Sequence, residues 1–189
     1  MATDSPTEVL FIGGRSGVGK TSVAAEASLV LARADVRHAL IEGDNLDQAH
    51  PEPWREGIDL AERNLAAMWR NYREVGYDRL IFTNTVSVLQ IPSLVAALGT
   101  HVRAFGVLLT ANDATAADRL ARREIGTALT EHIERSARAA ATLDAAEPAV
   151  HRVSTDARSV GDIALEVLAA TGWLEASPPH PAAEGTTAT

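Results

Sequence analysis

Residues 14–21 read Gly-Arg-Ser-Gly-Val-Gly-Lys-Thr, an octapeptide that fits the pattern G-x-x-x-x-G-K-[ST] at every position. A short apolar run at 9–12 precedes it, and a helix-compatible segment at 22–27 follows it. Strand, glycine loop and helix therefore come in the order in which this pattern cradles phosphate groups. The octapeptide predicts that the chain folds around such a loop and binds a nucleoside triphosphate there.

The residue types of the loop account for its affinity for phosphate. Glycines let successive backbone N–H groups turn into one concavity, and the following helix adds its own unpaired N–H groups. Lys20 is expected to act catalytically at the outer phosphates, and the Thr21 hydroxyl is suited to Mg²⁺. The predicted nucleotide-binding residues of this segment are Gly14, Arg15, Ser16, Gly17, Val18, Gly19, Lys20, Thr21 and Ser22.

Five strand-like apolar runs alternate with helix-compatible segments along the chain. The expected strands cover 8–13, 37–41, 79–84, 102–109 and 150–154, and the later helices cover 58–75, 90–98, 110–121, 129–143 and 160–170. This alternation predicts an α/β fold in which helices cover both faces of a parallel sheet. We expect one domain over 8–174, a flexible N-terminus at 1–7 and a disordered, proline-containing tail at 175–189.

The composition limits the kinds of partner that the chain can bind. The formal net charge of −8 argues against a nucleic acid or an anionic membrane as partner, because both attract basic surfaces. The chain has no cysteine, which excludes disulfides, zinc–thiolate sites and a thiol nucleophile. The sequence has neither the basic start typical of a targeting segment nor an apolar run long enough for a membrane segment. We therefore expect a cytoplasmic protein, either a monomer or a homodimer.

Carboxylates follow the second expected strand. Ligands of open parallel sheets bind at the carboxyl ends of the strands, and Glu42, Asp44 and Asp47 all lie just past such an end. A carboxylate there can orient a hydroxyl, accept its proton or hold Mg²⁺ through water. Asp44 is the leading candidate for the catalytic acid, but the choice among the three stays open, since Gly-Asp-Asn also suits an ordinary turn.

The third strand ends differently from that of many nucleotide-binding proteins. It runs into Thr83-Asn84-Thr85, where such proteins often place a metal-organising aspartate. The absence of that acid argues against a motor or switch and gives part of the metal role to the region of Asp44. Asn84 is equally suited to contact a substrate or to form a turn.

Arginines cluster near the middle of the chain. Arg119 and Arg123 are four residues apart, so a helix would place them on one face, and Arg122 lies between them. Two guanidinium groups can clamp a transferring phosphoryl group or stack on a base. The alternative is a solvated charged face beside Glu124.

Three segments together resemble the small P-loop kinases. They are the glycine loop at 13–22, Glu-Gly-Asp-Asn-Leu at 42–46 and Arg-Leu-Ala-Arg-Arg at 119–123. Their order is similar to that in the gluconate kinase, shikimate kinase and chloramphenicol phosphotransferase group, and Gly-Asp-Asn also resembles adenylylsulfate kinase. The resemblance covers residues 8–172.

This resemblance implies a P-loop NTPase three-layer sandwich with a five-stranded parallel sheet in the order 2-3-1-4-5 and a short lid at 119–130. It implies transfer of the γ-phosphate of ATP, with Mg²⁺, to a hydroxyl of a small molecule, a metabolite or an antibiotic. Asp44 matches the acid at the acceptor hydroxyl, Arg123 the lid arginine at the phosphates, and Arg119 the arginine near adenine. The residues that grip the acceptor in gluconate and shikimate kinases are not recognisable here, so the acceptor stays open.

Two other functions stay open. A nucleoside or nucleoside monophosphate kinase would need basic residues for its acceptor, which Arg55, Arg63, Arg70 and Arg73 could supply, although they also suit the solvated side of an amphipathic helix. A nucleotide-dependent switch or assembly factor would need a strand-end acid and an Asn/Thr-Lys-x-Asp motif, and the sequence has neither.

Overall fold

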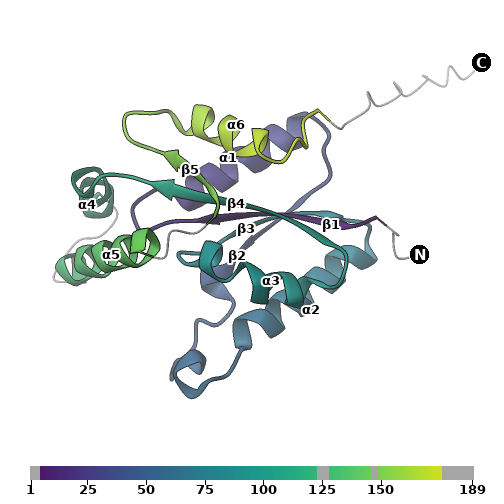
Figure 1. Ribbon diagram of the computed structural model, residues 1–189, viewed down its shortest axis with the longest axis horizontal. Coiled ribbons are helices and arrows are strands. Elements are labelled where there is room, and N and C mark those ends of the chain that lie inside the picture. Colours follow the sequence, from purple (N-terminus) through teal and green to yellow (C-terminus); the bar gives the residue numbers. More distant parts are fainter. Residues whose placement is uncertain (1–4, 123–127, 146–148, 176–189) are drawn as a thin grey trace, which may run out of the picture.

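The computed structural model describes residues 5–122, 128–145 and 149–175. Its centre is a five-stranded sheet in the order β2-β3-β1-β4-β5, in which every neighbouring pair is parallel (Figure 1). The strands are β1 Thr7–Gly13, β2 Ala39–Glu42, β3 Arg79–Thr83, β4 Val102–Thr110 and β5 His151–Ser154. The predicted parallel sheet and its strand order are confirmed.

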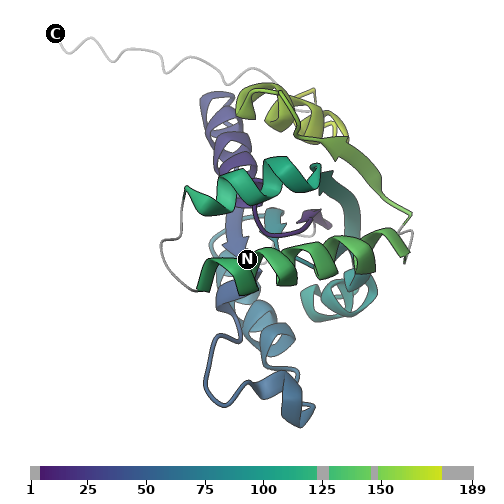
Figure 2. The same cartoon turned by 90° about the vertical axis from the view of Figure 1, so that its left-hand side faces the viewer.

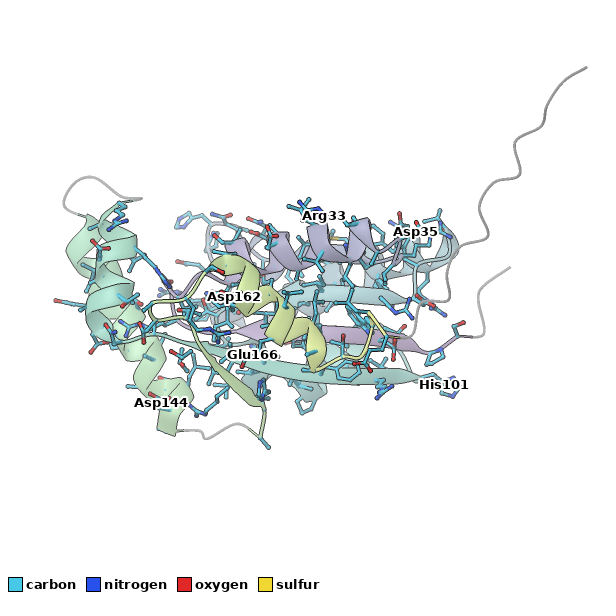
Figure 3. All side chains as sticks on the ribbon, turned by 90° about the horizontal axis from the view of Figure 1, so that it is seen from above. Arg33, Asp35, His101, Asp144, Asp162 and Glu166 are labelled. Carbon is cyan, nitrogen blue, oxygen red and sulfur yellow. The ribbon has the colours of Figure 1, made fainter. Side chains whose placement is uncertain are left out.

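Helices cover both faces and one end of this sheet. They are α1 Lys20–Arg33, α2 Leu60–Glu74, α3 Ile91–Leu98, α4 Asp113–Ala121, α5 Ala128–Ala145 and α6 Val160–Ala169. Helices α1 and α6 lie side by side on one face (Figure 3), and α2 and α3 lie on the other (Figure 1). Helices α4 and α5 lie beyond the carboxyl ends of the strands (Figure 2). The carboxyl edge of the sheet is thus framed by helices.

The packing of the core explains why β1 contains an unbroken apolar run. Leu10 and Ile12 pack with α1 and α6, whereas Val9 and Phe11 pack with α2 and α3. A strand that is buried on both faces has no polar side to show. At the start of β1, the buried indole of Trp69 donates to Thr7 Oγ1 at 3.1 Å, which fixes α2 against the sheet.

Element ends differ slightly from those expected. Strand β2 begins at Ala39, and the Arg37 side chain before it stacks over the Tyr77 ring and donates to the Val75 carbonyl oxygen. Strand β4 runs on to Thr110, and α4 starts only after Asn112, whose side chain accepts from the Thr115 N–H at 2.8 Å. Between β2 and α2 the chain forms a short 3₁₀ helix, Pro53–Glu56.

Most residues of the two terminal segments expected from the sequence lie outside the described residues. Thr7, the last residue of the expected flexible N-terminus, already belongs to β1, whereas 1–4 lie outside the described residues. The expected tail lies outside them from 176 onward. In the part of the chain that the structure describes, no helix is both long and apolar enough to cross a membrane.

Candidate active site

The glycine loop joins β1 to α1 and lies against two other elements. Gly14 and Gly17 have φ angles of 144° and 82°, which side-chain-bearing residues rarely adopt. A Cβ on Gly14 would lie 2.6 Å from the Leu109 carbonyl oxygen, and one on Gly17 would lie 2.5 Å from that of Ala116. Helix α1 begins after Gly19 with no acid in its first turn, so the positive end of its dipole suits an anion.

Lys20 lies over the mouth of this loop. Its Nζ donates to the carbonyl oxygens of Gly14 at 2.8 Å and Arg15 at 3.3 Å, and to Thr85 Oγ1 at 3.4 Å. Because Thr85 comes just after β3, the ammonium group lies between the loop and the end of the neighbouring strand. Thr21 and Ser22 are exposed in the first turn of α1. An exposed hydroxyl beside Lys20 fits a Mg²⁺ ion bound together with phosphates.

Two predicted nucleotide-binding residues turn their side chains away from the loop's mouth. The Arg15 side chain is buried, contacts Asp113 of α4 and donates from Nε to Ser136 Oγ of α5 at 2.9 Å. Ser136 in turn donates to the Ser16 carbonyl oxygen at 2.7 Å. The Val18 side chain is buried in the core. The side chains of Arg15 and Val18 therefore do not face a phosphate bound in the loop.

Arg119 joins the glycine loop to the loop after β5. From α4, its Nη1 donates to the Val18 carbonyl oxygen at 3.0 Å and to Thr155 Oγ1 at 2.9 Å. Arg122 differs, since it is exposed and pairs with Asp118 at 2.8 Å. Arg123 lies outside the described residues, as do 124–127 of the predicted lid.

Asp156 ties the loop after β5 to the start of α4. Its carboxylate accepts from the backbone N–H of Asn112 at 3.1 Å and from the Asn112 side chain at 3.0 Å. A side-chain hydrogen bond from Thr115 is the main cause that holds the pKa of Asp156 below its ordinary value, with smaller contributions from Asn112 and Arg119. Both ends of α4 are therefore fixed against this loop, which the sequence analysis did not predict.

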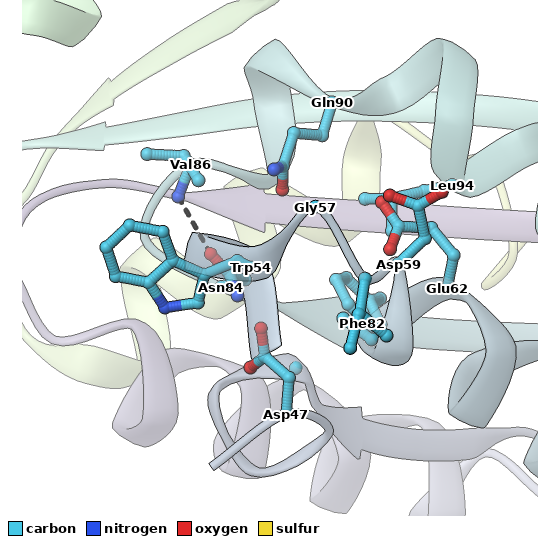
Figure 4. A pocket seen from close by; sticks show the side chains of 13 residues that line it. Asp47, Trp54, Gly57, Asp59, Glu62, Phe82, Asn84, Val86, Gln90 and Leu94 are labelled. Atoms are coloured by element: carbon cyan, nitrogen blue, oxygen red, sulfur yellow. Dashed lines mark hydrogen bonds between the residues drawn. The ribbon is translucent and has the colours of Figure 1, made fainter. Parts of the chain in front are cut away.

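A pocket of about 440 Å³ opens beside the ends of β2 and β3 (Figure 4), and we call it the strand-end pocket. It is lined by Gly43, Asp47, Trp54, Gly57, Ile58, Asp59, Ala61, Glu62, Phe82, Asn84, Val86, Gln90 and Leu94. Asn84 belongs to this lining, and the next residue, Thr85, contacts the ammonium group of Lys20. The strand-end pocket thus adjoins the glycine loop.

The candidate acids after β2 have different positions. Asp47 lines the strand-end pocket, whereas Asp44 is exposed in the 3₁₀ helix Gly43–Asn45 and Glu42 is half-buried at the strand's end. A Cβ on Gly43 would lie 2.4 Å from the Phe82 ring, so only glycine allows this close passage. Of the three acids, Asp47 alone belongs to the described lining of the strand-end pocket.

Two further lining acids, Asp59 and Glu62, were missed by sequence reasoning. They lie at the start of α2, where the amphipathic pattern gives no sign that an acid lines a pocket. The Asn84 Oδ1 accepts from the Val86 N–H at 2.9 Å in a turn, and the residue also lines the strand-end pocket.

None of the four arginines considered for binding an acceptor phosphate belongs to the described lining of the strand-end pocket: Arg55, Arg63, Arg70 and Arg73. Arg55 stacks over the Trp54 ring and pairs with Glu52 at 3.3 Å. Arg73 donates to the carbonyl oxygens of Tyr77 and Ser5, near the far end of α2. The pocket therefore lacks a described basic group for an acceptor phosphate.

No family model matches this chain, and no curated protein matches it in sequence. Solved structures share its fold. A gluconokinase from Sinorhizobium meliloti 1021 is 20% identical, with 89% of this chain and 93% of that chain covered and a TM-score of 0.58. The Deinococcus radiodurans tunicamycin resistance protein is 17% identical, with 88% and 96% covered and a TM-score of 0.60. A shikimate kinase from Acinetobacter baumannii in complex with shikimate is 15% identical, with 87% and 92% covered and a TM-score of 0.53. The predicted P-loop kinase fold is confirmed.

Proposed function

We propose that this chain is an ATP-dependent phosphotransferase that moves the γ-phosphate of ATP to a hydroxyl of a small molecule. One juxtaposition carries the proposal. Lys20 Nζ lies 3.4 Å from Thr85 Oγ1, and the adjacent Asn84 lines the strand-end pocket. A phosphate-binding loop and a pocket large enough for a small organic molecule therefore meet at one edge of the sheet. Among the proteins that share the fold are a gluconokinase and a shikimate kinase.

The nucleotide would lie along the glycine loop. Backbone N–H groups of the loop and the first turn of α1, including that of Ser22, would hold the phosphates. Thr21 would hold Mg²⁺, which when bound neutralises charge on the phosphate oxygens. Arg119 and the loop after β5 would flank the base, and Arg123 would reach the phosphates from the lid. Lys20 would stabilise the charge on the transferring group.

In the transfer step, the acceptor hydroxyl oxygen forms a bond to the γ-phosphorus. The bond from that phosphorus to the oxygen bridging to the β-phosphate breaks, and ADP leaves with the electron pair. The hydroxyl proton passes to a carboxylate and then to solvent. We propose Asp44 for this role because it directly follows the end of β2, and we assign to Asp47 a place in acceptor binding because it lines the strand-end pocket.

The other functions have less support. A nucleoside monophosphate kinase would need basic side chains around its acceptor, and none is among the described lining of the strand-end pocket. A nucleotide-dependent switch would need an acid after β3, where this chain has Asn84 and Thr85. We propose a cytoplasmic enzyme, a monomer or homodimer, with no nucleic-acid or membrane partner.

The test is a screen of the full chain with Mg-ATP against hydroxyl metabolites, nucleosides and antibiotics. ADP release is measured first, and phosphorylated products are then identified by mass spectrometry. We expect acceptor-dependent ADP release with one phosphate added to the acceptor. ADP release that needs no acceptor and yields only free phosphate would contradict a phosphotransferase.

A further inference from the structure

The described lining of the strand-end pocket carries charge of one sign only, and that sign is negative. Carboxylates line it from two directions: Asp47 follows β2, while Asp59 and Glu62 lie at the start of α2 beside Leu94 (Figure 4). Its remaining polar side chains are the amides of Asn84 and Gln90. Among the lining residues that the structure describes, none is Lys, Arg or His. Three carboxylates around one small volume favour a cationic occupant over an anionic one.

Basic side chains near the pocket do not neutralise these carboxylates. Arg55 is the basic residue beside Trp54, but its guanidinium group stacks on that ring and pairs with Glu52. Lys20 bonds the carbonyl oxygens of its own loop. Within the described residues, Asp47, Asp59 and Glu62 form no ion pair with a basic side chain. Their combined charge therefore faces whatever enters the pocket.

The other walls are apolar. The Trp54 ring is 60% exposed and stands at the pocket with Ile58, and Phe82 and Leu94 close the inner side. A flat indole face suits a ring or an aliphatic skeleton, and it also attracts a cation. The pocket thus offers one apolar face, one anionic side at the start of α2, and one end near Lys20.

We propose that the acceptor is an amine-bearing hydroxyl compound, such as an amino sugar, an aminocyclitol or an aromatic amino alcohol. Its ammonium group pairs with Asp59 and Glu62, its skeleton lies on Trp54, and its hydroxyl points toward Asn84 and Lys20. The phosphorylated hydroxyl is then the one remote from the amine. This inference rests on the proposed phosphotransferase function, because it names the substrate class of the same site.

The test uses two sets of hydroxyl compounds, each with one cationic, one neutral and one anionic member. One set is glucosamine, N-acetylglucosamine and glucuronic acid, and the other is tyramine, tyrosol and 4-hydroxyphenylacetic acid. Binding is followed by tryptophan fluorescence in the presence of a non-hydrolysable Mg-ATP analogue. Trp69 and Trp173 are 2% and 1% exposed, so a change on binding reports Trp54, and Trp54→Phe should abolish it. Phosphorylation is measured in parallel with Mg-ATP.

In each set the amine should bind at least about tenfold more tightly than its neutral counterpart, the factor given by one charge-assisted hydrogen bond. The acid should bind more weakly than the neutral compound. The double variant Asp59→Asn/Glu62→Gln should bring the amine down to the affinity of the neutral compound. Glu56→Gln should keep the preference, since Glu56 is an exposed acid of the same segment outside the pocket lining. Unchanged thermal unfolding and Mg-ATP affinity of the double variant would show that its fold is intact.

Equal binding across a set, a preference for the acid, or no response to either amine overturns the inference. The outcomes also separate it from the proposed function. Transfer of phosphate to neutral or acidic compounds but not to amines would leave the phosphotransferase standing and remove the amine. Selective binding of amines without any phosphate transfer would support a site for amines and contradict the phosphotransferase.

Discussion

Arg119 makes a two-pronged contact with Thr155, donating from Nη1 to its hydroxyl at 2.9 Å and from Nη2 to its carbonyl oxygen at 3.0 Å. The same Nη1 also donates to the Val18 carbonyl oxygen in the glycine loop. Helix α4 is thereby joined to both loops that would enclose a nucleotide. A planar guanidinium group can make these bonds simultaneously, whereas an ammonium group cannot reproduce the fork.

Replacing Arg119 by Lys should therefore loosen the loop after β5 while keeping the charge. We expect the KM for ATP to rise at least about tenfold and kcat to fall less, because the lost contacts position bound nucleotide. Steady-state kinetics with varied ATP measure this split. Arg122→Lys is the matched control, since Arg122 is exposed and pairs with Asp118 of α4. Equal KM values for the two variants would contradict the assignment.

Lys20→Ala should abolish turnover and leave the fold intact. The ammonium group bonds carbonyl oxygens at the loop's mouth and does not pack in the core. Loss of a charge at the transferring phosphate should raise the barrier by about 3 kcal/mol or more, a fall in kcat of about a hundredfold or more. Circular dichroism and thermal unfolding check the fold. Near-native turnover in this variant would rule out the proposed chemistry.

Asp44→Asn tests the proton acceptor. The amide keeps shape and hydrogen bonding but loses the basic oxygen, so the rate at saturating acceptor should drop at least about a hundredfold. Mg-ATP affinity by calorimetry should stay close to normal. Asp47→Asn should instead raise the KM for the acceptor, because Asp47 lines the strand-end pocket. The reverse pattern would move the base to Asp47, and full activity in variants of Glu42, Asp44 and Asp47 alike would show that none of these carboxylates is needed to accept the proton.

Gly17→Ala should disturb the loop for two reasons. Its φ of 82° is unfavourable for alanine, and the added Cβ would lie 2.5 Å from the Ala116 carbonyl oxygen. Gly172→Ala has the first problem alone, with a φ of 70° and no atom within 4 Å of the added Cβ. Backbone strain of this kind costs about 1–2 kcal/mol. Urea unfolding should show this cost for Gly172→Ala, a larger cost for Gly17→Ala, and weakened ATP binding for Gly17→Ala only.

Asp156→Asn should destabilise the protein in a pH-dependent way. Because the folded-state pKa of Asp156 lies below its ordinary value, its contribution to stability is present above that value and is lost as the pH falls through the folded-state pKa. The difference in unfolding free energy between wild type and variant should stay constant down to about pH 5 and close below about pH 3.9, the ordinary value for aspartate. Urea unfolding across this range measures it. A difference that grows on acidification would contradict the sign.

The fold could be predicted because its signals are local. The octapeptide at 14–21 sits between an apolar run and a helix, and β1 is apolar throughout because both of its faces are buried. Arg15 shows where such reasoning stops. Its position within the motif indicates a phosphate contact, but its side chain is held by Ser136, 121 positions further along the chain. No spacing rule connects those two residues.

The strand-end pocket illustrates the same limit. Asp44 could be selected because it follows a strand, but the turn that exposes it and directs Asp47 into the lining depends on the packing of Gly43 against Phe82. In the sequence, Asp59 and Glu62 follow the pattern of residues on the polar side of a helix. They become part of a pocket only because α2 begins beside the end of β3, which depends on the tertiary structure.

The ammonium group over the glycine loop is also chemically unique, because Lys20 is the sole lysine of the sequence. Amine-directed reagents such as succinimidyl esters therefore find one side chain to acylate, and it is the one that bonds the carbonyl oxygens of the loop's mouth. The extent of labelling at Lys20, read from its peptide by mass spectrometry, becomes a direct gauge of site occupancy by nucleotide. For the same reason, attaching the protein to a surface through lysine would consume the site that the measurement is meant to observe.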